Sequence, residues 1–137
     1  MISKSLTAWR SNETPDARWM AAMTAKGRTT AATDFCQLWL TCADKTEADK
    51  IANTLLVKHL VACVRQVPIT SDYWSRGKIN HDDEVLLMME SREDLFDEIQ
   101  AEIAKVHGYD TFVLEAVPVS RISKRAASWL NAETKNV

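Results

Sequence analysis

The chain has 137 residues, 46% of them hydrophobic and 26% charged, which is typical of one folded domain and excludes a disordered chain. Its formal net charge of −2 offers no basic surface for nucleic acid. No apolar run approaches the roughly 20 residues that span a bilayer. No secretory signal is recognisable, so we expect a cytoplasmic protein that binds neither nucleic acid nor membrane.

Residues 1–33 differ in composition from the rest of the chain, because they are rich in Ser, Thr and Ala and carry more basic than acidic residues. Residues 14–16, Thr-Pro-Asp, are typical of a helix start and Gly27 of a helix end, which predicts a short helix. The same composition is typical of an organelle transit peptide, and a start codon assigned too early would look alike. We treat this segment as an N-terminal extension of a main domain over residues 34–137.

Residues 35–42, FCQLWLTC, alternate between two faces that both carry apolar side chains. This pattern predicts a strand that is covered on both sides. Residues 43–60, ADKTEADKIANTLLVKHL, change to a helical period. Asp44 and Glu47 have the spacing of a capping pair, so we expect the helix to begin there.

Two strand patterns follow, and a tight turn joins them. Residues 61–69, VACVRQVPI, return to the strand period, with Pro68 marking a strand end or an edge strand. The run ITSDYW continues to residue 74, and EVLLMME forms the returning strand over residues 84–90. Gly77 in the connection SRGK supplies the turn, so the whole segment predicts a β-hairpin.

Residues 92–107, REDLFDEIQAEIAKVH, carry apolar side chains along one helical face. Ser91 and Asp94 are candidate caps at the start of this helix. Gly108 follows directly and is the expected end of the helix.

Residues 109–120 predict a last long strand, and residues 124–134 a short closing helix that offers Trp129 and Leu130 to the core. The order is therefore β-α-β-β-α-β plus a C-terminal helix, the split β-α-β or ferredoxin-like arrangement of the α+β class. Four antiparallel strands would have both helices on one face. The other face keeps apolar side chains, and an uncovered apolar face of this size predicts an oligomer.

Several segments of this chain, taken in order and spacing, resemble the CutA family of small trimeric divalent-cation tolerance proteins. The resemblance extends from Phe35 to Trp129 and is carried by LTCADKTEADKIANTLLVKHLVACV, QVPITSDYWSRGKI, HDDEVLLMMES, and HGYDT followed by VPVS. It implies a ferredoxin-like subunit, a homotrimer built by strand pairing, and a part in handling copper or another divalent cation. Because the family also resembles PII signalling proteins in architecture, an effector-sensing role stays open.

The sequence departs from the family pattern around the histidine of HGYDT. Gly108 stands where the family usually has Pro, and Phe112 and Val113 stand where it has a small residue or Pro and then Glu. Trp74 falls one residue before the family's hairpin tryptophan. Glu115 lies two residues after Val113 on the same strand face, so it is a candidate to replace the missing acid.

The candidate metal ligands include cysteine thiols and histidine rings. Cys36, Cys42 and Cys63 contain no C-x-x-C pair, which indicates reduced thiols, although Cys42 ends a strand and could bind copper. His107 at a helix end either caps carbonyls as an imidazolium or binds a metal ion as a neutral ring. The run from His81 to Glu84 is expected to be the solvated end of the hairpin, because consecutive strand residues face apart.

The residues and the resemblance together predict a metal site that contains His107, Cys42 and Glu115, with copper or another divalent cation as ligand. The alternative is a PII-like sensor or scaffold that binds a small anionic effector between subunits through Arg76, Lys78 and Tyr109. A purely structural trimer is the third interpretation. The sequence holds no recognised catalytic motif and no Gly-rich phosphate loop, so we expect neither an enzyme nor an organic cofactor.

Overall fold

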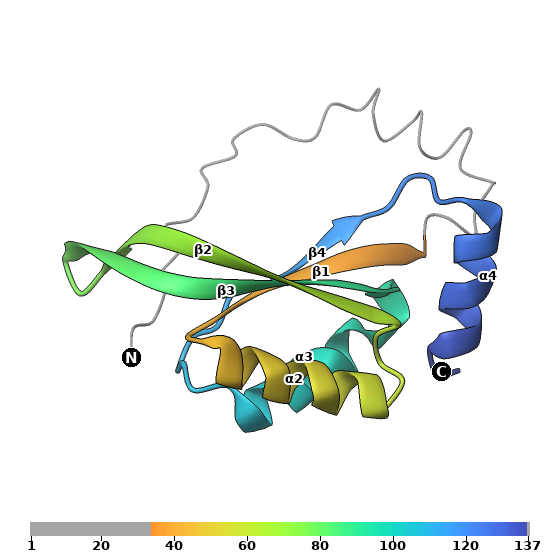
Figure 1. Cartoon of the computed structure of the whole chain (residues 1–137), viewed down its shortest axis with the longest axis horizontal. Helices are drawn as coiled ribbons and strands as arrows, with labels where there is room; N and C mark the ends of the chain where they lie inside the picture. Colours follow the sequence, from red (N-terminus) through yellow and green to blue (C-terminus); the bar gives the residue numbers. More distant parts are fainter. Residues whose placement is uncertain (1–33, 137) are drawn as a thin grey trace.

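The computed structural model describes residues 34–136, so the helix predicted between residues 14 and 27 lies outside the described residues. The elements are β1 (Phe35–Cys42), α2 (Lys45–Val57), β2 (Cys63–Ser75), β3 (Lys78–Arg92), the 3-10 turn η1 (Glu93–Leu95), α3 (Phe96–Val106), β4 (Leu114–Pro118) and α4 (Lys124–Glu133). The strands form one antiparallel sheet in the order β2-β3-β1-β4 (Figure 1). The predicted ferredoxin-like fold is thereby confirmed. No helix within residues 34–136 is long and apolar enough to cross a membrane.

The core lies between the sheet and the two helices α2 and α3, which cover the same face (Figure 1). Strand β1 directs alternate side chains into this layer, as its sequence period predicts. The buried side chains are Cys36, Leu38, Leu40 and Cys42 of β1, Leu87 and Met89 of β3, Ile51 and Leu55 of α2, and Ile99 and Ile103 of α3. Burial of a Leu or Ile side chain contributes about 1.5–3 kcal/mol, so this layer is the main source of stability.

Helix α2 begins at the predicted capping pair. The Glu47 N–H donates to Asp44 Oδ1 at 2.8 Å, and Glu47 Oε1 accepts the N–H of Ala43 at 2.9 Å. At the other end, His59 has a φ of 54°. This left-handed residue allows the Leu60 N–H to reach the Leu55 carbonyl at 3.0 Å, which closes the helix with a Schellman motif.

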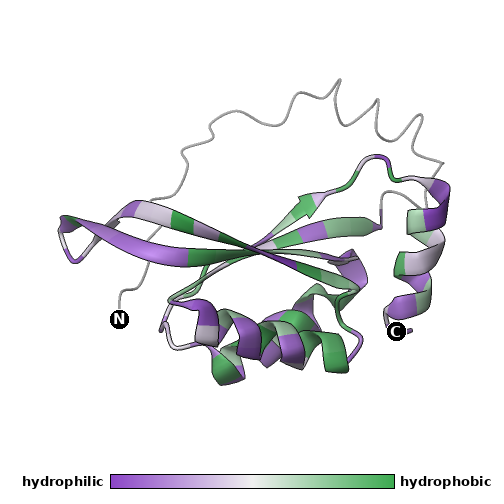
Figure 2. Ribbon diagram, in the orientation of Figure 1, coloured by the Kyte–Doolittle hydropathy of each residue, from purple (hydrophilic) through white to green (hydrophobic). Residues whose placement is uncertain are grey.

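The hairpin β2–β3 is continuous through Pro68, which the fold tolerates because β2 is an edge strand. Arg76 (φ 53°) and Gly77 (φ 77°) are the two turn residues between the paired Ser75 and Lys78. Two consecutive positive φ values are typical of a type I′ turn. The hairpin extends beyond the helices, and its outer part is mostly hydrophilic (Figure 2).

Two local predictions need correction. Ser91 does not cap α3, because its hydroxyl donates to the carbonyl of Leu60 at 2.6 Å, and the turn η1 precedes the helix instead. The predicted end of α3 is confirmed, because the helix stops at Val106, the extended His107 is its cap, and Gly108 follows directly. Trp129 is 42% exposed, so only Leu130 of the predicted pair enters the core.

The last strand is also shorter than predicted. Only Leu114–Pro118 pair with β1, while the preceding residues form an irregular loop after α3. That loop leaves the helix layer and carries residues 107–113 past the end of β1. Its course determines the geometry of the candidate site.

The C-terminus is held by a network that we call the C-terminal clasp: His59, Arg92, Thr134 and Lys135. The Arg92 guanidinium donates to Thr134 Oγ1 at 2.7 Å and to the Lys135 carbonyl at 3.0 Å. The Lys135 N–H donates to the His59 carbonyl at 2.8 Å. His59 therefore fixes the end of α4 to the end of α2.

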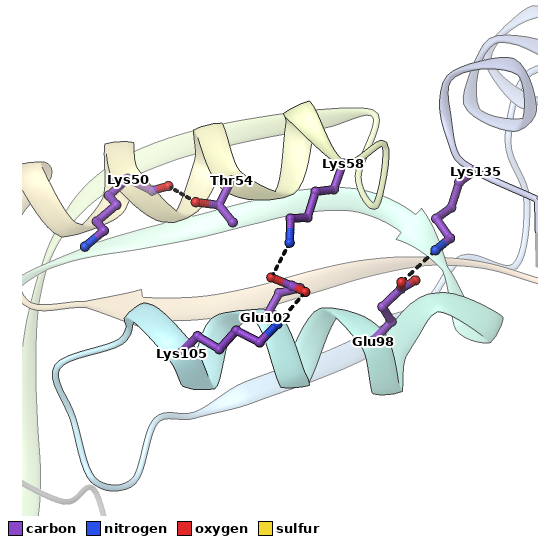
Figure 3. Close-up of polar contacts among 7 residues, drawn as sticks. All are labelled: Lys50, Thr54, Lys58, Glu98, Glu102, Lys105 and Lys135. Atoms are coloured by element: carbon purple, nitrogen blue, oxygen red, sulfur yellow. Dashed lines mark hydrogen bonds and ion pairs between the residues drawn. The ribbon is translucent and has the colours of Figure 1, made fainter.

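Exposed ion pairs connect the helices at the surface (Figure 3). Glu102 of α3 accepts from Lys58 at the end of α2 at 2.8 Å and from Lys105 at 2.9 Å. Lys135 reaches Glu98 at 2.6 Å. Such exposed pairs contribute less than about 1 kcal/mol each, so the buried layer rather than these contacts holds the helices.

Candidate functional site

Three potential metal ligands from distant parts of the chain meet at one end of β1. Cys42 is the last residue of β1, Glu47 lies in the first turn of α2, and His107 follows α3. One donor atom of each residue lies within 4.8 Å of the others. No second group of this kind exists in the described part of the chain.

The His107 ring is fixed by hydrogen bonds at both nitrogens. The N–H of Tyr109 donates to Nδ1 at 3.1 Å, and Nε2 lies 2.9 Å from the Thr41 carbonyl oxygen. An amide N–H can only donate and a carbonyl can only accept, so these contacts place a ring proton on Nε2 and the lone pair on Nδ1. The ring does not cap the carbonyls of α3, because Nε2 contacts the Thr41 carbonyl of β1 instead.

Glu47 joins the two chain segments that flank the cluster. Its Oε1 accepts the Ala43 N–H, and its Oε2 accepts the N–H of Gly108 at 2.9 Å. Oε1 also lies 3.7 Å from His107 Nε2, and the carboxylate side chain is only 15% exposed. The carboxylate thus holds the start of α2 against the loop that carries His107.

The Cys42 thiol is buried in the core beside these groups. Burial, with the nearby carboxylates of Glu47, Glu84 and Asp44, raises its pKa to about 12. Cys42 is therefore protonated at neutral pH. A metal ion that binds the sulfur must displace this proton, because the thiolate is the ligand.

Two aromatic rings enclose the His107 imidazole, whose side chain has no exposed surface. The centroid of Tyr109 lies 4.8 Å from the imidazole centroid and that of Phe112 lies 5.3 Å away. The Tyr109 hydroxyl donates to Oε2 of Glu84, which is 3% exposed, at 2.8 Å. Burial and this bond raise the pKa of Tyr109 far above its usual value, so the hydroxyl keeps its proton.

Glu115 does not join the cluster. It pairs directly with Trp39, on the sheet face that the helices leave uncovered, whereas Cys42 points into the core on the other face. Directly opposite residues of an antiparallel pair share a face, so the sheet separates Glu115 from Cys42 and His107. Glu47 supplies the acid of the cluster instead. The sequence identified Glu47 only as a capping residue, because nothing local indicates its contact with the loop after α3.

The residues of the predicted effector site lie apart within one chain. Arg76 and Lys78 are at the tip of the hairpin, whereas Tyr109 is bound to Glu84. Glu84 lies six residues from Lys78 along β3, which corresponds to about 20 Å at 3.3 Å per residue. One chain therefore does not bring these three side chains to a common ligand.

The run from His81 to Glu84 behaves largely as predicted. His81 and Asp83 are exposed, and His81 pairs with Asp72 across the hairpin at 2.6 Å. Asp82 accepts from the hydroxyl of Tyr73. Glu84 departs from the prediction, because it is buried and bound to Tyr109 instead of being solvated.

A cavity of about 320 Å³ lies beside the cluster, lined by Gln100, Asp110, Thr111, Phe112 and Leu114. Phe112 lines this cavity and also stacks on His107. Phe112 therefore links this cavity to the imidazole. A thiol, an imidazole and a carboxylate together suit zinc or copper, the metals that accept mixed sulfur, nitrogen and oxygen ligands.

The sequence model of the CutA1 divalent ion tolerance protein family matches residues 36–133. The divalent-cation tolerance protein CutA of Pyrococcus horikoshii is 34% identical over 98 residues, covering 72% of this chain and 96% of the relative. The structure of the periplasmic divalent cation tolerance protein CutA from Archaeoglobus fulgidus aligns with a TM-score of 0.73 at 32% identity, covering 74% of this chain and 99% of that chain. CutA1 from Oryza sativa aligns with a TM-score of 0.75 at 28% identity, covering 79% and 100%.

Proposed function

The chain belongs to the CutA1 divalent ion tolerance protein family, and on this premise we propose that it binds a divalent metal ion, copper first, through Cys42, Glu47 and His107. The observation that carries the proposal is the convergence of these three donors within 4.8 Å. They come from three separate elements and meet in a buried place, where unpaired polar groups are costly. The ion is cargo in this proposal, and the protein acts by binding rather than by catalysis.

The donor types favour copper among the divalent cations. Cu²⁺ binds mixed nitrogen, oxygen and sulfur sites more strongly than Zn²⁺ does, and the thiolate of Cys42 would also retain Cu(I). Hard cations such as Mg²⁺ and Ca²⁺ prefer sites made only of oxygen, so we expect them not to compete. The cavity behind Phe112 is the proposed route of the ion to the cluster, because Phe112 alone of its lining residues stacks on His107.

The test is a titration of the purified chain with Cu²⁺, and separately with Zn²⁺, against a competing chelator. We expect about one ion per chain, and His107→Ala should weaken binding by at least tenfold, since even outer-shell changes cost about 10–100-fold. The control is His81→Ala, which removes a 74% exposed histidine that could bind copper adventitiously. Uptake that does not saturate, or that falls only in the His81 variant, would contradict the proposal.

We further propose that the chain assembles as a homotrimer, the assembly that its resemblance to the family implies. The uncovered sheet face supports this proposal, because Trp39, Val67 and Val117 are 37%, 40% and 36% exposed there. An apolar face of this kind is typical of an interface. Sedimentation should give three times the chain mass, and Trp39→Glu should lower it toward that of one chain. A wild-type chain that sediments alone at micromolar concentration would contradict the trimer.

We also propose a cytoplasmic location, which is supported by the free thiols of the described cysteines, Cys36, Cys42 and Cys63. The Archaeoglobus fulgidus relative is described as periplasmic, so location differs among relatives under this proposal. Fractionation of the source cells is the test. Recovery of the protein outside the cytoplasm would contradict it.

A further inference from the structure

The lone pair of the His107 imidazole points away from the proposed ligands. Nδ1, which carries the lone pair, accepts the Tyr109 N–H at 3.1 Å. Nε2, which carries the proton, faces the Thr41 carbonyl and lies 3.7 Å from Glu47 Oε1. A metal ion needs the lone pair on the nitrogen that faces the other ligands. In this arrangement Nε2 presents its proton, and not a lone pair, to the other proposed ligands.

An ion can bind Nε2 of a neutral ring only if the proton is on Nδ1. The Tyr109 N–H occupies that position, and two donors cannot face each other. The Tyr109 N–H must therefore leave Nδ1 before the ion binds. The ring proton then passes from Nε2 to Nδ1 by exchange with water, and the Cys42 thiol proton leaves to solvent.

The Tyr109 side chain is anchored so that this release has an energetic cost. Its hydroxyl donates to the buried Glu84 at 2.8 Å, and its ring packs against the imidazole. Gly108, directly before it, donates its N–H to Glu47 Oε2 at 2.9 Å. Two hydrogen bonds thus hold the segment between His107 and Tyr109 against β3 and α2.

The spacing of the donors leaves the orientation of the imidazole as the obstacle to binding. All three donors lie within 4.8 Å of one another, and His107 Nε2 is 3.7 Å from Glu47 Oε1. Neighbouring ligands of a tetrahedral ion with bonds of about 2.0–2.3 Å lie roughly 3.5 Å apart, so these two groups are already near that spacing. The lone pair of the imidazole, rather than the distance between donors, must change before an ion binds.

We propose that Tyr109, anchored by Glu84, is a latch that fixes the His107 proton on Nε2 and keeps the cluster from binding an ion until the loop is released. Tyr109 and Glu84 are positioning residues in this scheme, because neither offers an atom to the ion. The inference rests on the proposed metal-binding function. It adds that ion binding is slowed and weakened by a contact outside the ligand set.

The latch is tested with Tyr109→Phe, which deletes the bond to Glu84 and keeps the aromatic ring beside His107. Glu84→Gln is the conservative companion, because its amide oxygen still accepts the Tyr109 hydroxyl. Ser91→Ala is the matched stability control, since it deletes a buried hydroxyl bond, to the Leu60 carbonyl, at the far end of β3. All variants are made in the full chain, and Zn²⁺ is the probe because it avoids redox chemistry.

Three readouts apply to each protein: the ¹⁵N resonances of the His107 ring without metal, hydrogen exchange of the Tyr109 amide, and the rate and affinity of Zn²⁺ binding. The wild-type ring should have its proton on Nε2. In Tyr109→Phe, amide exchange and Zn²⁺ association should each accelerate by about tenfold and Kd should fall, as expected for the loss of one hydrogen bond. Glu84→Gln and Ser91→Ala should stay close to wild type.

A wild-type ring with its proton on Nδ1 would overturn the latch. So would a Tyr109→Phe protein whose Zn²⁺ association matches that of Ser91→Ala while His107→Ala still abolishes binding, and in that case the proposed function would stand. Binding gained only by Tyr109→Phe would support a latch that is fully closed in the wild type. If no variant binds Zn²⁺ or Cu²⁺, both the function and the latch are wrong.

Discussion

The two ends of β1 both bury polar side chains, yet they differ in what those side chains can do. At its start, beside the C-terminal clasp, Arg92 pairs with Phe35 in register, and its guanidinium binds Thr134 and Lys135. At its end, Cys42 meets Glu47 and His107. The guanidinium and the backbone carbonyls of the clasp have only one hydrogen-bonding use each, since a guanidinium cannot accept and a carbonyl cannot donate. A thiol and an imidazole can each exchange a proton for a metal ion.

The comparison shows that burial of a polar cluster does not by itself indicate a binding site. The clasp contains the buried side chains of Arg92 and Thr134. Its role is structural, because the polar groups of these side chains already form hydrogen bonds within the protein. In the cluster around Cys42, the imidazole and the carboxylate are also hydrogen-bonded. These groups and the thiol can, in addition, bind a metal ion. Of these two polar groups, the clasp should therefore contribute to stability and not to ion affinity, whereas the cluster should determine ion affinity.

The largest expected effect is a loss of stability when the hydrogen bonds of the clasp are removed. Arg92→Met keeps most of the side-chain volume but leaves Thr134 and the Lys135 carbonyl without the guanidinium. Loss of a buried charged donor should lower the free energy of unfolding by about 2–4 kcal/mol. Urea denaturation measures this change. Ion affinity measured below the unfolding transition should stay within twofold of wild type, and a parallel loss of affinity would contradict the separation of the two ends.

A second prediction uses the two buried thiols, one at each end of β1. Burial, reinforced by carboxylates at each end, raises the pKa of both Cys36 and Cys42 from the usual 9.0 to about 12. Unfolding restores the ordinary pKa, so this stabilisation is complete below pH 9 and is lost as pH rises toward 12. Each thiol should contribute a slope of up to about 1.4 kcal/mol per pH unit in that window.

Urea denaturation between pH 8 and pH 10.5 checks the slope for wild type and for Cys36→Ala. The variant should lose about half of the thiol contribution and should keep its ion affinity, because Cys36 lies at the clasp end. An unchanged slope in Cys36→Ala would contradict a buried neutral thiol at this position.

The smallest expected effect concerns an exposed ion pair between α2 and α3. Lys58→Ala removes one exposed ion pair with Glu102, and Lys105 remains to pair with the same carboxylate (Figure 3). The free energy of unfolding should fall by less than about 0.5 kcal/mol, and this difference should vanish in high salt. Thermal denaturation at low and high salt measures it. A loss above 1 kcal/mol would show that surface pairs carry stability that we assign to the clasp and core.

Local sequence patterns predicted the elements that depend on local physics. The alternation of FCQLWLTC gave β1 with its observed bounds, and the Asp44–Glu47 spacing gave the start of α2. The order of the elements then led to the sheet topology. Pro68 was compatible with an edge strand, and β2 is one.

The features that were missed depend on contacts between distant segments. Glu47 belongs to the cluster because the loop after α3 returns to α2, which no pattern around Glu47 reveals. Glu115 lies on the opposite sheet face because β4 pairs Glu115 with Trp39, a register that the sequence does not specify. Ser91 bonds to a distant carbonyl instead of capping α3. In each case, the contacts of the side chain are decided by distant segments of the chain and not by the local sequence.

The most direct test of the account is X-ray absorption spectroscopy of the chain loaded with one equivalent of Zn²⁺. The account predicts one sulfur ligand at about 2.3 Å with nitrogen and oxygen ligands near 2.0 Å, and loss of the sulfur signal in Cys42→Ser. A spectrum with only nitrogen and oxygen ligands, unchanged in Cys42→Ser, would contradict a metal site at the end of β1.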